Sequence, residues 1–153
     1  MRLSDFVVRE AVIHDLKASA KEAAIREMVG GLHDAGYFKA GELEDVVGAI
    51  QRREKLGSTG IGGGIAIPHS RHNTVTRPLG LVGISRGGVA FESVDGKPVH
   101  VFILLISPPD RPDLHLRALE KASRSLRNEK FVHALREAAT PDAIWALLDA
   151  SDD

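Results

Sequence analysis

The chain has 153 residues, of which 43 % are hydrophobic and 27 % charged, and its net charge at neutral pH is −1. This length predicts a single domain, residues 1–153, and the near-neutral charge gives no electrostatic basis for binding nucleic acid or an anionic membrane. The absence of cysteine excludes disulfides and thiolate chemistry, and the lack of a signal sequence or a long apolar run predicts a cytoplasmic protein without membrane insertion.

The first part of the chain predicts one strand followed by two amphipathic helices. Residues 11–16 have the composition of a strand. A capping box from Ser19 to Glu22 predicts the start of a helix, in which apolar residues at i, i+3, i+4 and i+7 begin at Ile25. The same spacing begins at Leu43 and predicts a second helix, and a glycine follows each of the two helices.

The middle of the chain predicts three strands, at residues 65–68, 79–85 and 99–106. The last of these is apolar apart from His100, which is typical of a central strand that is covered on both faces. Two consecutive prolines follow it and end the strand.

The last part of the chain predicts three helices, capped in turn by Asp113, by Asn128 and by Thr140 with its following proline. Apolar residues at helical spacing support them: Leu116, Leu119 and Leu126 in the first, Phe131 and Leu135 in the second, and Ile144, Leu147 and Leu148 in the third. The order β-α-α-β-β-β-α-α-α places helices on both faces of the sheet and predicts a three-layer α/β/α domain.

A glycine-rich segment, residues 57–64, leads into the sequence Ile-Ala-Ile-Pro-His that ends at His69. The segment has neither the Gly-Lys-Ser/Thr triplet of a P-loop nor the third glycine of a dinucleotide fingerprint, so both nucleotide motifs are excluded. Pro68 fixes the backbone just before His69 and delivers the imidazole rigidly, as a base, a metal ligand or a nucleophile. The spacing of His69 and His72 matches no established metal site.

Other side chains are expected to lie near His69. His115 falls in the first turn of the helix that follows the buried strand, and it shares the sheet edge with His69 if their strands run parallel. A helix N-terminus disfavours imidazolium, which keeps His115 neutral. Arg53 continues the inward stripe of the second helix, and Ser58 and Thr59 place hydroxyls close by.

Two stretches of sequence identify a family. Residues 53–62, Arg-Glu-Lys-Leu-Gly-Ser-Thr-Gly-Ile-Gly, and residues 64–69, Gly-Ile-Ala-Ile-Pro-His, resemble the active-site signature of enzyme IIA of the bacterial phosphoenolpyruvate-dependent phosphotransferase system. The resemblance is to the fructose/mannitol type, and within it the nitrogen-regulatory branch is most similar. Residues 95–99 and His115-Leu116 resemble later motifs of the family.

The resemblance implies a three-layer α/β/α fold with a mixed sheet, and it implies that His69 is phosphorylated through Nε2. The phosphoryl donor would be the phospho-histidine of an HPr-like phosphocarrier protein. Arg53 would match the active-site arginine of the family and His115 its second histidine. The expected phosphate-stabilising residues are Thr59, Ser58 and Ser70, the last standing where relatives often have glycine.

The scheme requires no metal and no cofactor, and it leaves two functions open. The protein is a carrier that passes the phosphoryl group toward a sugar, or a regulatory module in which the phosphate is a switch for binding a target protein, and the two roles are compatible. Without cysteine the chain carries no cysteine-phosphorylated enzyme IIB, so a transport partner would be a separate protein. A hydrolase with His69 as base is disfavoured, because no nucleophile or carboxylate pair accompanies the motif.

Overall fold

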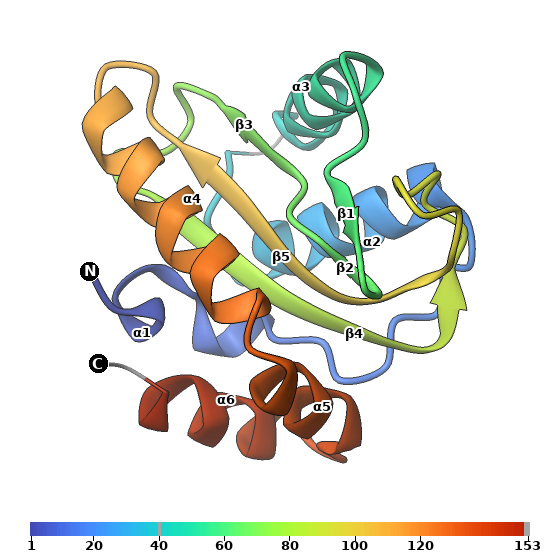
Figure 1. The fold of residues 1–153 in the computed structure, drawn as a ribbon. Coiled ribbons are helices and arrows are strands. Elements are labelled where there is room, and N and C mark those ends of the chain that lie inside the picture. Colours follow the sequence, from blue (N-terminus) through green and yellow to red (C-terminus); the bar gives the residue numbers. More distant parts are fainter. Residues whose placement is uncertain (40, 152–153) are drawn as a thin grey trace.

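The computed structural model describes residues 1–39 and 41–151, which fold into a mixed sheet covered by helices on both faces (Figure 1). Its strands are β1 Gly60–Gly62, β2 Ile65–Ala66, β3 His69–Arg71, β4 Leu79–Val89 and β5 Val99–Ser107. Strand β5 is central: β4 pairs with it antiparallel on one side, and β2 and β3 pair with it parallel, one after the other, on the other side. Strand β1 pairs antiparallel with β2.

The helices form the two outer layers (Figure 1). Helices α2 Lys21–Asp34 and α3 Leu43–Lys55 cover one face of the sheet, in one hydrophobic core. The short helix α1 Leu3–Phe6 and the three helices after the sheet cover the other face and form a second hydrophobic core with it. These three helices are α4 Pro112–Leu126, α5 Glu129–Glu137 and α6 Pro141–Ala150. The predicted three-layer α/β/α class with a mixed sheet is confirmed.

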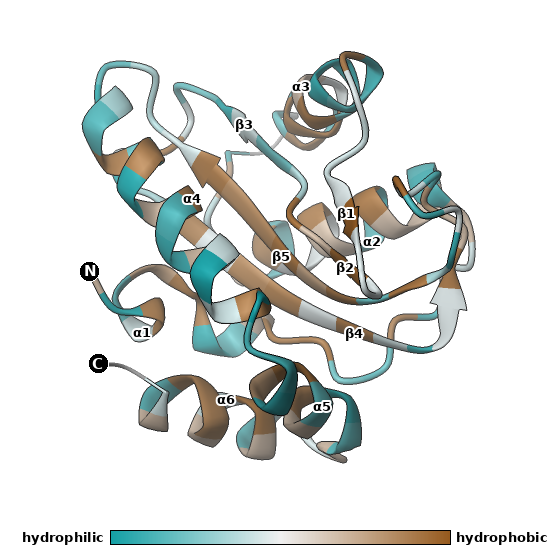
Figure 2. Ribbon diagram, in the orientation of Figure 1, coloured by the Kyte–Doolittle hydropathy of each residue, from teal (hydrophilic) through white to brown (hydrophobic). Residues whose placement is uncertain are grey.

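Strand β5 separates the two cores, as its composition predicts. Phe102, Leu104 and Ile106 face α2 and α3, whereas Ile103 and Leu105 face α4. This is the two-residue alternation of a strand, and it buries both sets because each face of the sheet carries helices. Figure 2 shows β5 as a nearly continuous hydrophobic stripe between helices whose outer faces are hydrophilic.

The strand predicted at residues 11–16 is wrong. A 3₁₀ helix, Arg9–Ala11, occupies its start, and a single bridge then joins Ile13 to Gly83 of β4. The backbone bends at His14 and Asp15, so no continuous strand forms, although Leu16 N still donates to the carbonyl oxygen of Ile84 at 2.7 Å. The glycine-rich segment, in contrast, contributes β1, and Pro68 divides the predicted strand 65–68 from the additional strand β3.

Two of the predicted helix caps are wrong and two are confirmed. Helix α2 begins after Ala20 and has no side-chain cap. Ser19 instead pairs with Ala90 through its backbone, because its carbonyl oxygen accepts from Ala90 N. Helix α4 begins after Arg111, since a proline at the first helical position starts the helix before Asp113. Side-chain caps are formed by Asn128, which accepts from Phe131 N at 3.2 Å, and by Thr140, which accepts from Ala143 N at 3.1 Å.

The predicted inward stripe of α4 is also partly wrong. Leu116 is 67 % exposed, and the buried residues of this helix are Ala118, Ala122 and Leu126. The small alanines allow α4 to lie close against the sheet. Because Ala118 and Ala122 face the sheet, Leu116 points toward solvent. None of the helices in the described part of the chain is long and apolar enough to cross a membrane.

Candidate functional site

The sheet brings His69 and His115 together. His69 begins β3 and lies opposite Leu105 in the parallel pairing with β5, and His115 lies in the first turn of α4, just after β5 ends. The prediction from sequence required the strand before His69 to run parallel to the buried strand, and this condition is met because β2 also pairs parallel with β5. The centroids of the two imidazole rings lie 5.6 Å apart with the ring planes inclined by 53°.

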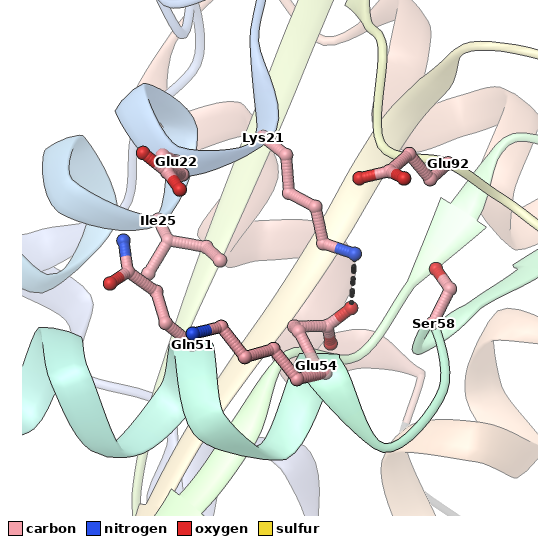
Figure 3. Close-up of a pocket in the computed structure, with 8 residues that line it drawn as sticks. Lys21, Glu22, Ile25, Gln51, Glu54, Ser58 and Glu92 are labelled. Carbon is pink, nitrogen blue, oxygen red and sulfur yellow. Dashed lines mark ion pairs between the residues drawn. The ribbon is translucent and has the colours of Figure 1, made fainter.

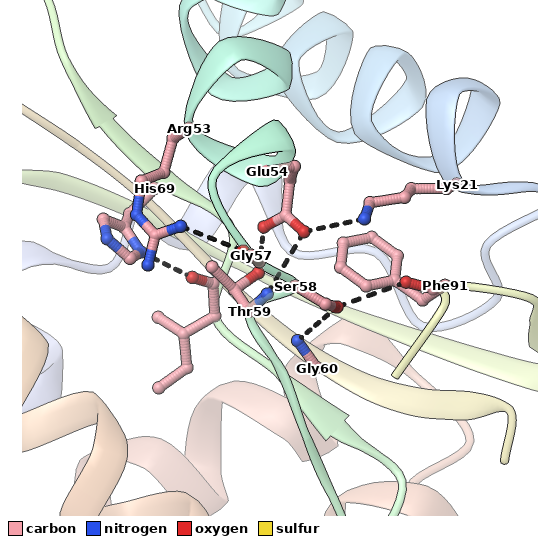
Figure 4. Close-up of polar contacts among 10 residues, drawn as sticks. Lys21, Arg53, Glu54, Gly57, Ser58, Thr59, Gly60, His69 and Phe91 are labelled. Atoms are coloured by element: carbon pink, nitrogen blue, oxygen red, sulfur yellow. Dashed lines mark hydrogen bonds and ion pairs between the residues drawn. The ribbon is translucent and has the colours of Figure 1, made fainter. Parts of the chain in front are cut away.

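The orientation of the His69 ring is fixed by its own backbone. Its Nδ1 lies 2.7 Å from the carbonyl oxygen of Ile67 (Figure 4). A carbonyl oxygen only accepts hydrogen bonds, so Nδ1 carries the proton and donates it. In the neutral ring the lone pair then lies on Nε2, which is the nitrogen left to act as a nucleophile or base.

The surroundings of His69 keep it neutral. Burial lowers the pKa of this imidazole, the hydrogen bond to Ile67 acts in the opposite direction, and the positive charge of Arg53 lowers the pKa further. The net direction is downward from the ordinary value near 6.5. A neutral ring at physiological pH has the free lone pair that a nucleophilic nitrogen needs.

His115 is held and tuned in a similar way. Its Nδ1 lies 2.7 Å from Oγ of Ser107, a fully buried residue at the end of β5. Burial, followed by the charges of His69 and Arg71, lowers the pKa of His115 to about 4. His115 is therefore neutral at physiological pH, and it can donate a hydrogen bond to an anion without carrying charge.

Arg53 supplies a cation beside His69. It lies in the last turn of α3, and one guanidinium nitrogen, Nη1, donates to the carbonyl oxygen of Gly57 at 3.0 Å (Figure 4). This hydrogen bond ties the end of α3 to the glycine-rich segment and holds the guanidinium next to the imidazole. The structure thus brings together three residues that the sequence analysis selected.

Two further contributors were missed from the sequence. Arg71 lies on β3 two residues after His69, hence on the same face of the strand, and its charge acts on the pKa of both histidines. The two-residue spacing was the available signal. Ser107, which orients His115, follows the apolar run of β5 and had no signal of its own.

Glu54 is the third residue that was missed, and it anchors the glycine-rich segment. Its carboxylate, only 3 % exposed, accepts from the backbone nitrogen of Thr59 at 3.1 Å and from the Thr59 hydroxyl. Nζ of Lys21 pairs with the same carboxylate at 3.0 Å (Figure 4). The spacing did contain a signal, because Glu54 is i+7 from Val47 and so lies on the inward stripe of α3.

Behind this anchor lies a pocket of about 430 Å³, which Lys21 and Glu54 line together with Ser58 and Glu92 (Figure 3). Nζ of Lys21 also lies 4.8 Å from the centre of the Phe91 ring, a cation–π contact. The histidines and Arg53 do not line this pocket, so it is separate from the group of residues around His69.

The family of the chain follows from a match that covers most of it. Residues 5–151 match the family model described as "Phosphoenolpyruvate-dependent sugar phosphotransferase system, EIIA 2". The chain belongs to this enzyme IIA family.

Relatives of this enzyme IIA include regulatory and sugar-specific proteins. A nitrogen regulatory protein of Bradyrhizobium diazoefficiens is 33 % identical over 97 % of the chain and 95 % of the relative. The fructose-specific EIIABC component of Bacillus subtilis is 34 % identical over 99 % of the chain, which spans only 24 % of that longer protein.

Solved structures agree with the fold of this enzyme IIA. The nitrogen regulatory protein IIA-Ntr of Neisseria meningitidis superimposes with a TM-score of 0.85 at 28 % identity, over 95 % of this chain and 98 % of the other. Enzyme IIA mannitol of Escherichia coli, solved in complex with phosphorylated enzyme IIB mannitol, has a TM-score of 0.76 at 24 % identity, over 92 % and 95 % of the two chains. The second likeness concerns the fold alone.

The expected phosphate-stabilising hydroxyls of this enzyme IIA have other partners. The Ser58 hydroxyl donates to the carbonyl oxygen of Phe91 at 3.3 Å and accepts from Gly60 N, while the Thr59 hydroxyl donates to Glu54. Ser70 follows His69 on β3, so its side chain projects from the opposite face of the strand. The structure brings none of these hydroxyls to His69, and their contact with phosphate stays a prediction.

The ion pair of Glu54 with Lys21 should be important for stability. The Glu54→Gln variant leaves the Lys21 ammonium, 16 % exposed, without its counter-ion, and we expect a loss of about 2–3 kcal/mol in the free energy of unfolding. Urea denaturation measures this loss. The matched control is Glu44→Gln, which breaks the exposed pair with Arg26 and should cost much less, because water screens that pair. Equal losses in the two variants would contradict the anchoring role.

The lowered pKa of His115 predicts a pH dependence of stability. Near pH 6.5 the unfolded chain takes up a proton on His115, whereas the folded protein does so only at about 4. Unfolding therefore takes up a proton within this window, and the contribution of His115 to stability is lost as the pH falls from 6.5 toward 4. An NMR titration of the His115 ring, with urea denaturation at each pH, tests this, and a midpoint at or above 6.5 would refute it.

Proposed function

We propose that this enzyme IIA accepts a phosphoryl group on Nε2 of His69 from the phospho-histidine of an HPr-like phosphocarrier, in the cytoplasm and with a nitrogen-regulatory role. The observation that carries the proposal is the hydrogen bond from His69 Nδ1 to the carbonyl oxygen of Ile67, at 2.7 Å. It directs the lone pair to Nε2 and leaves only this nitrogen to attack phosphorus.

The reaction is a displacement at phosphorus between two histidines. The Nε2 lone pair of His69 forms the new P–N bond, the P–N bond to the donor histidine breaks, and the donor nitrogen recovers that electron pair. Because the transferred group is loose and metaphosphate-like, positioning and electrostatic stabilisation supply most of the catalysis. The Ile67 carbonyl assists, since it accepts a stronger hydrogen bond from Nδ1–H as positive charge develops on the ring.

The neighbouring groups have complementary roles in this scheme. Arg53 and Arg71 provide positive charge for the equatorial oxygens of the phosphoryl group. His115 is neutral because its pKa is lowered to about 4. It can therefore donate a hydrogen bond to a phosphoryl oxygen without repelling the two arginines. Burial of the histidines slows the attack of water on the phosphohistidine.

The nitrogen-regulatory reading is supported by the structural matches. The nitrogen regulatory protein IIA-Ntr of Neisseria meningitidis superimposes with a TM-score of 0.85, against 0.76 for enzyme IIA mannitol of Escherichia coli. In this role the phosphate on His69 would switch the binding of a regulatory target. A sugar-specific function is the alternative, in which a separate enzyme IIB accepts the phosphoryl group, as the complex of the Escherichia coli mannitol proteins suggests.

Phosphorylation of His69 can be tested by reconstitution. Incubation with phosphoenolpyruvate, enzyme I and an HPr-like carrier should label the wild-type protein with one acid-labile phosphoryl group, and NMR should locate it on Nε2. His69→Ala should not be labelled, because the accepting nitrogen is missing. His72→Ala, which removes a nearby imidazole that accepts from Thr74 N, is the matched control and should be labelled normally. Labelled His69→Ala, or a phosphate on Nδ1, would refute the proposal.

Replacement of Arg53 tests the electrostatic part of the mechanism. Arg53→Ala should slow phosphoryl transfer by about 10²-fold, since one preorganised charge is lost from the transition state. Rapid-quench measurement of transfer from the phosphorylated carrier gives the rate, and urea denaturation gives the stability. Arg52→Ala, the neighbouring exposed arginine on α3, should leave the rate unchanged. A slower rate that follows only from unfolding would contradict the role assigned to Arg53.

A further inference from the structure

A different pocket, of about 490 Å³, lies between the hairpin of β1 and β2 and the helices α4 and α5. It is separate from the phosphorylation site. Ile65 in its wall pairs with Val101 of β5, whereas His69 pairs with Leu105 four residues further along. At about 3.3 Å per residue the pocket begins about 13 Å along the sheet from His69.

The walls of this pocket are apolar. Ile65 and Leu126 belong to the core beneath it, and Val132 of α5 forms another part of the lining. Ile61 of β1 borders the opening and is 48 % exposed, which leaves a large apolar side chain in contact with water. A ligand with an apolar body would remove this surface from water, and a volume within about 300–1,000 Å³ is typical of small-molecule sites.

Arginines supply most of the charged groups around the pocket. Arg127, His133 and Arg136 line it, and Glu129 is the carboxylate among the lining residues. Within residues 1–39 and 41–151, the side chains of these three basic residues have neither a hydrogen-bond nor an ion-pair partner. The guanidinium groups of Arg127 and Arg136 are therefore available to bind an anion next to an apolar wall.

The strip of basic residues, Arg127, His133 and Arg136, extends beyond this pocket. His133 and Arg136 also line an adjoining pocket of about 370 Å³, where Arg86 and the carboxylate of Glu137 lie as well. Arg86 donates to the carbonyl oxygen of Ala138 at 2.8 Å, which fixes its position next to the strip. A negative group held between Arg127 and Arg136 would therefore also be within the field of a third arginine.

We propose that the pocket between the β1–β2 hairpin and α5 binds a small organic anion, a carboxylate on an apolar body. The apolar part lies against Ile61, Ile65 and Val132, and the carboxylate is bound by Arg127 and Arg136, whose planar forks match its two oxygens. An amine of the same shape would be repelled by these cations. Free phosphate would leave the apolar walls in water.

The test uses two probes with the same apolar body and opposite charge. 4-Phenylbutyrate should cause saturable shifts of backbone amide NMR signals at Gly63, Val132 and His133, while 4-phenylbutylamine should bind at least about tenfold more weakly. Equal binding of the amine would overturn the proposal, because the cations would then contribute nothing. Shifts confined to the surroundings of His69 would also overturn it, because the anion would then be using the other cationic site.

Variants locate the charges that bind the carboxylate. The double variant Arg127→Gln/Arg136→Gln should weaken 4-phenylbutyrate binding by about tenfold. Arg117→Gln, an exposed arginine of α4 that does not line the pocket, is the matched control and should bind as the wild type does. His69→Ala should also bind normally, so this result is independent of the proposed phosphorylation. Unchanged affinity in the double variant would refute the site.

Discussion

The candidate active site depends on the buried carboxylate of Glu54. Glycines give the segment at residues 57–64 great conformational freedom, and Gly57 and Gly62 have the positive φ angles of 151° and 94°. Such a segment needs fixed points. Glu54 provides one by accepting two hydrogen bonds from Thr59, and Lys21 provides the charge that makes its burial tolerable. Arg53, the preceding residue on α3, is held beside His69 as a consequence.

The sheet topology supplies the other constraint. Because β3 and β5 run parallel, the imidazole at the start of β3 and the one in the first turn of α4 lie at the same edge. The same burial lowers the pKa of both rings, yet their hydrogen bonds differ. The Ile67 carbonyl fixes the tautomer of His69, whereas the Ser107 hydroxyl can donate to His115 or accept from it. The tautomer of His69 is thus fixed with the lone pair on Nε2, whereas His115 can still adapt to a ligand.

The sequence predicts what local rules and strong periodicity determine, and it fails where tertiary partners decide. The buried strand β5 and the caps at Asn128 and Thr140 follow directly from composition and spacing. The Ser19 cap failed because the backbone there pairs with Ala90, a contact that no local pattern reveals. At the site, the signature and the spacing selected His69, His115 and Arg53. The sequence placed Ser58 and Thr59 in the loop near His69. Their hydrogen-bond partners, the carbonyl oxygen of Phe91 and the carboxylate of Glu54, determine where the hydroxyls point.

The charges around His69 explain how phosphorylation would change this surface. Before transfer, two neutral imidazoles lie with two cations, Arg53 and Arg71, so the local charge is positive. A phosphoryl group adds about −1.5 to −2 charges and brings this sum close to zero. A target with an acidic face would therefore bind the unphosphorylated form more tightly. A negatively charged phosphocarrier would likewise be attracted less strongly to this surface after it has transferred its phosphoryl group. The two arginines proposed to lower the barrier to transfer would thus also set the sign of the proposed switch.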